Sequence, residues 1–154
     1  MKFNLFAILS LVLTVSPSAA YYVFSEVSLV TVSNDTETSG FPLAAMGEGN
    51  NVEYLFYEGA IKYNYNNVTG SIYTTDETII SLQVNTSTLI IEFANSTTYD
   101  YWSFDSNDYL QLNGSSNGFY LCKNFDDPSG YSETRYGLVY GNINTSCKPI
   151  KLVT

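Results

Sequence analysis

The stretch that indicates the fold most clearly runs from Trp102 to Cys122 and reads W-S-F-D-S-N-D-Y-L-Q-L-N-G-S-S-N-G-F-Y-L-C. Apolar and polar residues alternate in short runs, and Asn, Gly and Ser separate those runs. This pattern is typical of antiparallel β-strands joined by tight turns. The region as far as Ile150 also holds the only tryptophan and the only two cysteines of the chain. We therefore expect strands to dominate here.

Outside this stretch, the same alternation continues and helical spacing is rare. The clearest hairpin pairs Ile79–Val84 with Thr88–Phe93, because Asn85-Thr86-Ser87 forms a short turn between them. The pattern of about ten short strands predicts a single domain that is either an antiparallel β-sandwich or a closed barrel, and a β-trefoil is the alternative. The expected strands are Val23–Val32, Leu43–Met46, Glu53–Tyr57, Ala60–Tyr65, Ile72–Thr74, Ile79–Val84, Thr88–Phe93, Tyr101–Phe104, Tyr109–Leu112, Phe119–Lys123, Arg135–Tyr140 and Pro149–Val153.

The first twenty residues have the order of a secretory signal peptide. Lys2 supplies the positive start, Leu5–Val15 is a short apolar run, and Ser18-Ala19-Ala20 places small residues before a cut at Tyr21. We expect residues 1–20 to be removed and residues 21–154 to fold as one secreted domain. Lys148–Thr154 is not the hydrophobic tail of a lipid-anchor signal, so no membrane anchor is expected.

Composition limits the possible functions. The chain has 15 acidic and 6 basic residues, a net charge of −9, and no histidine. So acidic a chain is repelled by phosphate backbones and anionic lipid, which disfavours nucleic-acid and membrane partners. The lack of histidine excludes Ser-His-Asp and Cys-His catalysis. We predict that the protein is not an enzyme and needs no cofactor.

Cysteines and glycosylation motifs fit an extracellular protein. Two cysteines in a secreted chain predict one disulfide, Cys122–Cys147, whose loop of about 25 residues contributes roughly 3 kcal/mol in the chain-entropy model. N-x-Ser/Thr sequons, most of them in expected turns, predict heavy N-glycosylation. The sequon asparagines are Asn34, Asn67, Asn85, Asn95, Asn113 and Asn144.

Other polar groupings have simpler interpretations. Asp100, Asp105, Asn107 and Asp108 gather oxygen ligands, but their spacing matches no complete calcium loop, so we expect a solvated turn. The acid pairs Asp76-Glu77 and Asp126-Asp127 are expected to be solvated charge rather than glycosidase acids. Aromatic side chains could stack on sugars, although most should be core: Tyr54, Tyr57, Tyr63, Tyr65, Tyr101, Trp102, Tyr120, Tyr136 and Tyr140.

The order of motifs after Tyr101 resembles the C-terminal domain of the PIR mannoproteins of yeast cell walls. That domain combines Trp-Ser, Gly-Tyr-Leu-x-Leu, Phe-Tyr-x-Cys and Cys-Ser-x-Ile, and weaker similarity extends back to Val52. The resemblance implies a secreted all-β wall protein. It covers Trp102, Tyr109, Leu110, Leu112, Phe119, Tyr120, Cys122, Cys147 and Ile150.

The chain departs from the family in its means of attachment. It has two of the family's four typical cysteines, and it lacks the Gln-rich repeats that link PIR proteins to β-1,3-glucan. Its only glutamines, Gln83 and Gln111, fall within expected strands. We expect a non-catalytic structural or surface-coat glycoprotein of the fungal cell wall. The alternative is a carbohydrate-binding or adhesin-like module that contacts wall polysaccharide such as β-glucan.

Overall fold

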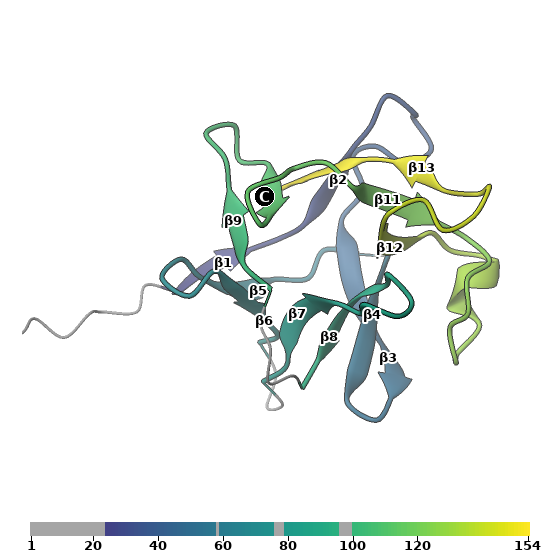
Figure 1. Cartoon of the computed structure of the whole chain (residues 1–154), viewed down its shortest axis with the longest axis horizontal. Helices are drawn as coiled ribbons and strands as arrows, with labels where there is room; N and C mark the ends of the chain where they lie inside the picture. Colours follow the sequence, from purple (N-terminus) through teal and green to yellow (C-terminus); the bar gives the residue numbers. More distant parts are fainter. Residues whose placement is uncertain (1–23, 58, 76–78, 96–99) are drawn as a thin grey trace, which may run out of the picture.

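The computed structural model describes residues 24–57, 59–75, 79–95 and 100–154, and the strands formed by these residues pair antiparallel (Figure 1). The predicted all-β class is confirmed. The strands are β1 (Phe24–Val27), β2 (Val30–Val32), β3 (Leu43–Gly49), β4 (Val52–Tyr57), β5 (Tyr63–Asn66), β6 (Ser71–Tyr73), β7 (Ser81–Val84), β8 (Ile91–Ala94), β9 (Trp102–Phe104), β10 (Leu110–Leu112), β11 (Phe119–Cys122), β12 (Gly137–Tyr140), β13 (Lys148–Pro149) and β14 (Lys151–Val153), and one 3₁₀ turn, η1, spans Tyr131–Glu133. Among the described residues, no helix has the length and apolar character that a membrane span needs.

Most strands belong to one sheet with the order β1-β5-β6-β7-β8-β4-β12-β11-β13, and β3 adds to the other edge of β4. Two small sheets, β9 with β10 and β2 with β14, complete the pairing. Across the described residues the main sheet begins at β1 and ends at β13 without closing. The closed-barrel alternative is therefore wrong, and the closed barrel that a β-trefoil needs is also missing from this part of the chain.

The predicted central hairpin is confirmed as β7 and β8, with Leu82 opposite Phe93. Its turn is longer than the sequence suggested. Leu89 falls within the predicted strand Thr88–Phe93, yet it is 39% exposed and has a left-handed φ of 62°. Its backbone N–H donates to the Asn85 carbonyl at 2.7 Å, which keeps Leu89 in the turn. Strand pairing therefore begins after the predicted start at Thr88.

Other strand limits also differ from the prediction, because pairing partners set where each strand ends. Val23–Val32 is interrupted between β1 and β2, where Leu29 turns into the core with no exposed surface. The strand expected at Ala60–Tyr65 starts only at Tyr63, and Ile61 is 38% exposed. The C-terminal strand splits at Ile150, since β13 pairs with β11 whereas β14 pairs with β2.

Strand β4 is the junction of the main sheet. Along one edge it pairs with β3, and along the other it pairs first with β8 and then with β12. Where β12 meets it, Gly137 lies opposite Phe56. A Cβ at Gly137 would come within 2.5 Å of the Phe125 ring and 3.0 Å of Phe56. Only glycine allows the backbone to approach these rings so closely.

Two groups of buried side chains stabilise the fold. The larger group surrounds Trp102 and joins the main sheet to both small sheets. The smaller group, Tyr54, Phe56, Ile90, Cys122 and Val139, lies around β4 and β12. The larger group is Val27, Leu29, Leu43, Leu55, Tyr63, Tyr65, Ile72, Ile80, Leu82, Ile91, Phe93, Trp102, Leu110, Leu112, Phe119, Leu121, Leu138, Ile150 and Leu152.

Tyr63 connects this core to the outer edge of β3. Its hydroxyl donates to the Leu43 carbonyl at 3.2 Å and accepts from the Ala45 N–H at 3.0 Å. Burial raises the pKa of Tyr63 well above its ordinary value, and burial also raises the pKa of Tyr54 and Tyr65. The folded state therefore holds these phenols neutral.

The buried tyrosines predict a loss of stability in alkali. The pKa values of these tyrosines in the folded state lie above the unfolded value of about 10. Their contribution to the free energy of unfolding is therefore complete below about pH 10, and it is lost as the pH rises through the folded-state pKa values. Tyr63→Phe should lower the free energy of unfolding by about 1–2 kcal/mol at neutral pH, because Ala45 loses its acceptor. It should also reduce the alkaline loss. Urea unfolding at neutral pH and at about pH 11 measures both effects, and equal alkaline losses in the two proteins would contradict the assignment.

Candidate functional site

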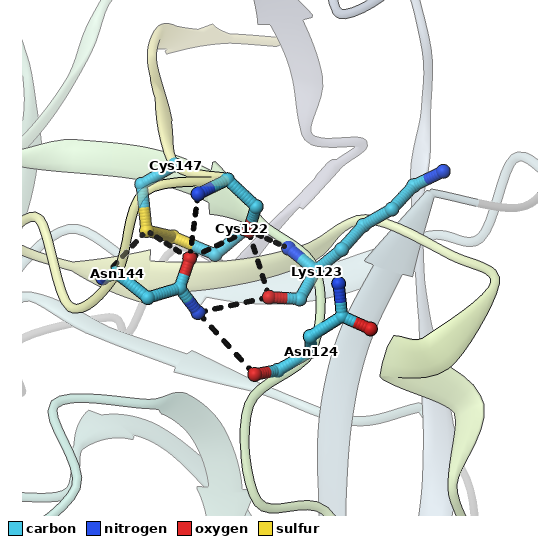
Figure 2. Close-up of a disulfide and its surroundings, with 6 residues drawn as sticks. Cys122, Lys123, Asn124, Asn144 and Cys147 are labelled. Atoms are coloured by element: carbon cyan, nitrogen blue, oxygen red, sulfur yellow. Dashed lines mark hydrogen bonds between the residues drawn. A yellow bond between two sulfur atoms is a disulfide. The ribbon is translucent and has the colours of Figure 1, made fainter.

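The predicted disulfide is confirmed. Cys122 ends β11 and is fully buried, and it is bonded to Cys147, which lies just before β13. The two Cα atoms are 4.1 Å apart. The bridge therefore holds the segment after β12 against the end of β11 (Figure 2).

The six sequon asparagines lie in different environments. Asn34, Asn67, Asn95 and Asn113 are exposed and lie outside the strands, although Ser96 and Thr97 of the Asn95 sequon fall outside the described residues. Asn85 and Asn144 are half-buried. The Asn85 amide donates weakly to Glu92, at 3.4 and 3.5 Å, and the Asn144 amide donates to backbone carbonyls.

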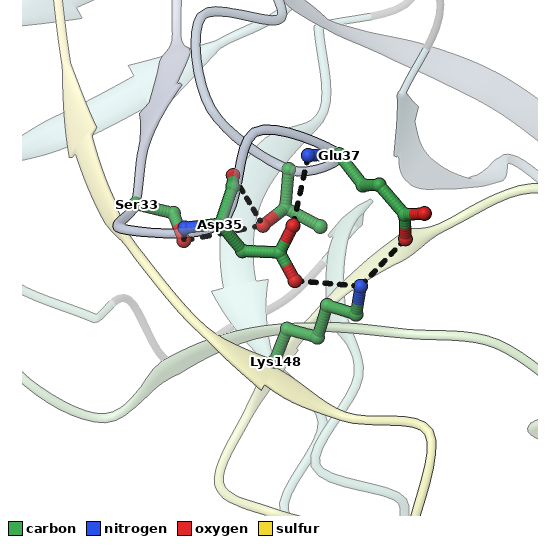
Figure 3. Close-up of polar contacts among 5 residues, drawn as sticks. Ser33, Asp35, Glu37 and Lys148 are labelled. Atoms are coloured by element: carbon green, nitrogen blue, oxygen red, sulfur yellow. Dashed lines mark hydrogen bonds and ion pairs between the residues drawn. The ribbon is translucent and has the colours of Figure 1, made fainter.

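The loop that carries Asn34 is held by an ion pair with the C-terminal part of the chain (Figure 3). The Lys148 ammonium lies 2.7 Å from a carboxylate oxygen of Asp35 and 2.7 Å from one of Glu37. The Lys148 hydrogen bond lowers the pKa of Asp35. Inside the loop, the Asp35 N–H donates to the Ser33 hydroxyl at 3.0 Å. Asn34 is therefore presented on a fixed turn.

A groove of about 460 Å³ lies next to this loop, within the size range of small-ligand sites. It is positioned by strands from both ends of the chain, since Lys151 pairs with Val32 and Tyr120 pairs with Pro149. Figure 1 shows β11 and β13 side by side in this region. The groove is lined by Val32, Ser33, Asn34, Tyr109, Asn117, Gly118, Phe119, Tyr120, Pro149, Ile150 and Lys151.

The lining of the groove suits an uncharged polar ligand. Tyr109 and Tyr120 are half-buried, and Asn34 and Asn117 are exposed. The Lys151 ammonium lies 4.8 Å from the centre of the Tyr109 ring. Among the residues that the structure describes, no carboxylate lines the groove, although the whole chain carries a net charge of −9. Aromatic faces can pack against the C–H faces of sugar rings, and amides can both donate to and accept from hydroxyls.

A second depression, about 410 Å³, is more charged. The Lys123 ammonium lies 4.6 Å from the Tyr136 ring centre and the Lys148 ammonium lies 5.5 Å from it. Glu37 lines the same depression and pairs with Lys148. Glu37 is thus already engaged by Lys148, and Lys123 and Arg135 add positive charge to the lining. The first groove is therefore the better candidate for a neutral ligand.

The acidic groupings have structural roles where they can be described. Asp127 was expected to be solvated, but this is wrong: it is 9% exposed and accepts hydrogen bonds from the Tyr131 and Ser132 backbones and the Ser132 hydroxyl. Asp105 accepts from the backbone of its own turn, whereas Asp100 accepts from the Val84 N–H. Within the described ranges, no group of three or more acidic or cysteine side chains is placed to hold a metal ion. Asp76-Glu77 lies outside the described residues.

The structure separates the aromatic candidates into core and surface. Tyr54, Tyr63, Tyr65 and Trp102 are buried, and Tyr101 is 50% exposed. Tyr57, Tyr120, Tyr136 and Tyr140 are half-buried. Of these nine residues, Tyr120 alone lines the groove. The other polar residues that line the groove were not predicted from the sequence as ligand contacts. Tyr109, Asn117 and Lys151 come together through pairing between distant strands, which leaves no local pattern in the sequence.

Comparison with known proteins gives no match to a protein family, to a curated protein or to a solved structure.

Proposed function

We propose that this chain is a secreted, N-glycosylated, non-catalytic protein of the fungal cell wall, with a structural or surface-coat role. The observation that carries the proposal is the placement of sequons. Asn34, Asn67, Asn95 and Asn113 are all exposed outside the strands, where a bulky hydrated glycan can be attached without disturbing the core. The domain would act passively, as a stable disulfide-linked carrier of glycan.

We infer that the sheets are arranged as a β-sandwich. In the larger core, Phe93 of the main sheet is grouped with Trp102 and Leu110 of the β9–β10 sheet and with Leu152 of the β2–β14 sheet. The main sheet would form one layer and the two small sheets the other. Such an arrangement suits a surface protein, because the loops that carry glycans lie outside the packed layers.

The resemblance to PIR domains supports the assignment to a cell wall through residues that determine structure. Trp102, Leu110 and Phe119 are buried, and Cys122 and Cys147 form the disulfide. The shared pattern is therefore a set of core and bridge positions, as expected for a common fold. The fungal source and the wall location rest on this resemblance.

Attachment to a wall would be non-covalent or through disulfide exchange. Both glutamines are half-buried in strands, and each side chain has a partner: Gln83 donates to Glu92 at 3.2 Å, and Gln111 accepts from Ser103 at 3.3 Å. Such groups are poorly placed for ester linkage to glucan. Sequential extraction of walls from the producing organism tests the proposal. We expect the protein in the medium or in detergent with reductant, and recovery only after alkali or glucanase would contradict this mode of attachment.

A second candidate function is carbohydrate binding, and the groove lined by Tyr109 and Tyr120 favours it. Because Asn34 lines the same groove, its glycan would compete with an external ligand, so the test needs the unglycosylated protein. Tyr109→Ala combined with Tyr120→Ala should weaken retention on insoluble β-glucan about tenfold or more, equivalent to at least about 1.4 kcal/mol.

Tyr101→Ala is the matched control, because Tyr101 is exposed but does not line the groove. It should leave retention unchanged. If wild-type protein is not retained, or if the control variant loses as much retention as the groove variant, the groove is not a glucan site.

A further inference from the structure

The Asn144 sequon differs from the exposed sequons in the contacts of its amide nitrogen. Asn144 Nδ2 donates to the Lys123 carbonyl at 2.9 Å and to the Asn124 carbonyl at 3.4 Å (Figure 2). An amide nitrogen has two hydrogens, so these two bonds use both of them. Asn144 therefore fastens its own loop to the residues that follow β11.

The hydroxyl of the same sequon is engaged as well. Ser146 Oγ accepts from the Lys123 N–H at 2.8 Å and lies 2.7 Å from the Lys123 carbonyl and 2.6 Å from Asn144 Oδ1. Asn144 Oδ1 also accepts from the Ser146 N–H at 2.8 Å. Both side chains that define the sequon are thus bound to each other and to the backbone of Lys123. We call Asn144, Ser146 and their contacts with residues 123–124 the clasp.

The disulfide holds the two halves of the clasp together. Lys123 directly follows Cys122, and Ser146 directly precedes Cys147, so bond formation brings the two segments side by side. The Asn144 N–H also lies 3.4 Å from the Cys147 sulfur. Without the bridge, hydrogen bonds rather than a covalent bond would have to hold residues 144–147 beside residues 123–124.

N-glycosylation of Asn144 would remove one of the two hydrogens that its amide uses in the clasp. In that reaction the amide nitrogen displaces a lipid diphosphate from C1 of the sugar, so that an N–C bond forms, the C1–O bond breaks, the lipid diphosphate leaves and the nitrogen gives up one proton. A glycosylated Asn144 would keep one hydrogen and could not donate to both carbonyls. Asn144 is half-buried and its Nδ2 faces the backbone of residues 123–124, so a sugar there would have to displace the loop.

We propose that the Asn144 sequon is a redox-gated modification site, which accepts a glycan only in chains whose Cys122–Cys147 bridge has not formed. Closure of the bridge builds the clasp and keeps Asn144 unmodified in the mature protein. The gating claim rests on the proposed function, because it requires a chain that passes through a glycosylating compartment. The clasp itself does not depend on it.

Site-resolved mass spectrometry of glycopeptides tests the gate. Wild-type chain is compared with Cys122→Ala/Cys147→Ala, and also with wild-type chain made in the presence of a membrane-permeant reductant. Whole-cell extracts are used, so a variant that is not secreted is still measured. Asn144 should be essentially unoccupied in untreated wild type and severalfold more occupied in both bridge-free samples, while occupancy of Asn67 stays constant. High Asn144 occupancy in wild type, or no increase without the bridge, would overturn the proposal.

The clasp is tested independently in protein from a host that does not glycosylate. Asn144→Asp keeps the acceptor oxygen but removes both donors, and it should lower the midpoint of thermal unfolding by about 4 °C or more. Asn67→Asp, at an exposed sequon, should change the midpoint by less than about 2 °C. Equal midpoints for the two variants would refute the clasp. If none of the sequons of the wild-type chain carries a glycan, that result would count against the proposed function. The unfolding midpoints of the two variants would still show whether the clasp exists.

Discussion

Replacing Trp102 with alanine should lower the free energy of unfolding by about 3–5 kcal/mol, a large share of the stability of a domain this size. Trp102 has no exposed surface, and its ring stacks on Phe119 with a centroid distance of 6.3 Å. Its indole N–H donates to the Leu82 carbonyl at 2.9 Å, and its backbone N–H donates to Gly70 at 2.7 Å. The residue connects three segments, so its truncation leaves a cavity where they meet.

Trp102→Phe is the informative companion variant. It keeps most of the aromatic volume but removes the donor to Leu82, and it should cost less than the alanine variant, about 1–3 kcal/mol. Urea unfolding followed by circular dichroism measures both, because the only tryptophan is lost as a fluorescent probe. An alanine variant within about 1 kcal/mol of wild type would contradict the central place of Trp102 in the core.

Loss of the disulfide should have an effect of similar size. Replacing both cysteines with alanine should lower stability by about 2–5 kcal/mol, because the bridge closes a loop with a sequence separation of 25 residues. Cys122 also packs with Phe56 and Val139 in the smaller core, so part of the loss comes from packing. The segment between β12 and β13 should loosen first.

Thiol titration and urea unfolding measure this effect. The denatured, unreduced wild type should have no free thiol, and reductant should move its unfolding midpoint toward that of the double alanine variant. Two free thiols per chain before reduction, or a midpoint that reductant does not change, would contradict the bridge.

Local features of the fold were predictable from the sequence. Strict alternation placed Leu82 and Phe93 on facing strands, and the presence of only two cysteines in the sequence indicated their own pairing. Strand limits were less predictable, because they depend on partners. Leu89 is an apolar residue in an alternating run, as is typical of a strand, yet its hydrogen bond to the Asn85 carbonyl keeps it in a turn. Asp127 looks solvated in sequence but is buried by the hydrogen bonds it accepts.

Contacts between distant strands could not be predicted. The three-way pairing of β4 and the pairing of β2 with β14 join residues far apart in the chain. The groove depends on the second of these, since it brings Asn34 near Lys151. Likewise, all six sequons match the same N-x-Ser/Thr motif in the sequence. Only their surroundings distinguish Asn144, whose amide is bonded, from an exposed asparagine such as Asn67.

The central claim, that this is a secreted glycoprotein with glycans on its exposed turns, is tested most directly by the mass of the protein secreted from its producing cells. Intact mass spectrometry before and after endoglycosidase treatment, with site assignment by peptide, provides the measurement. The proposal predicts a mass well above that of the polypeptide, occupancy at Asn34, Asn67, Asn95 and Asn113, and collapse to the mass of residues 21–154 after treatment. A single unglycosylated species, or a chain retained inside the cell with residues 1–20 still attached, would contradict it.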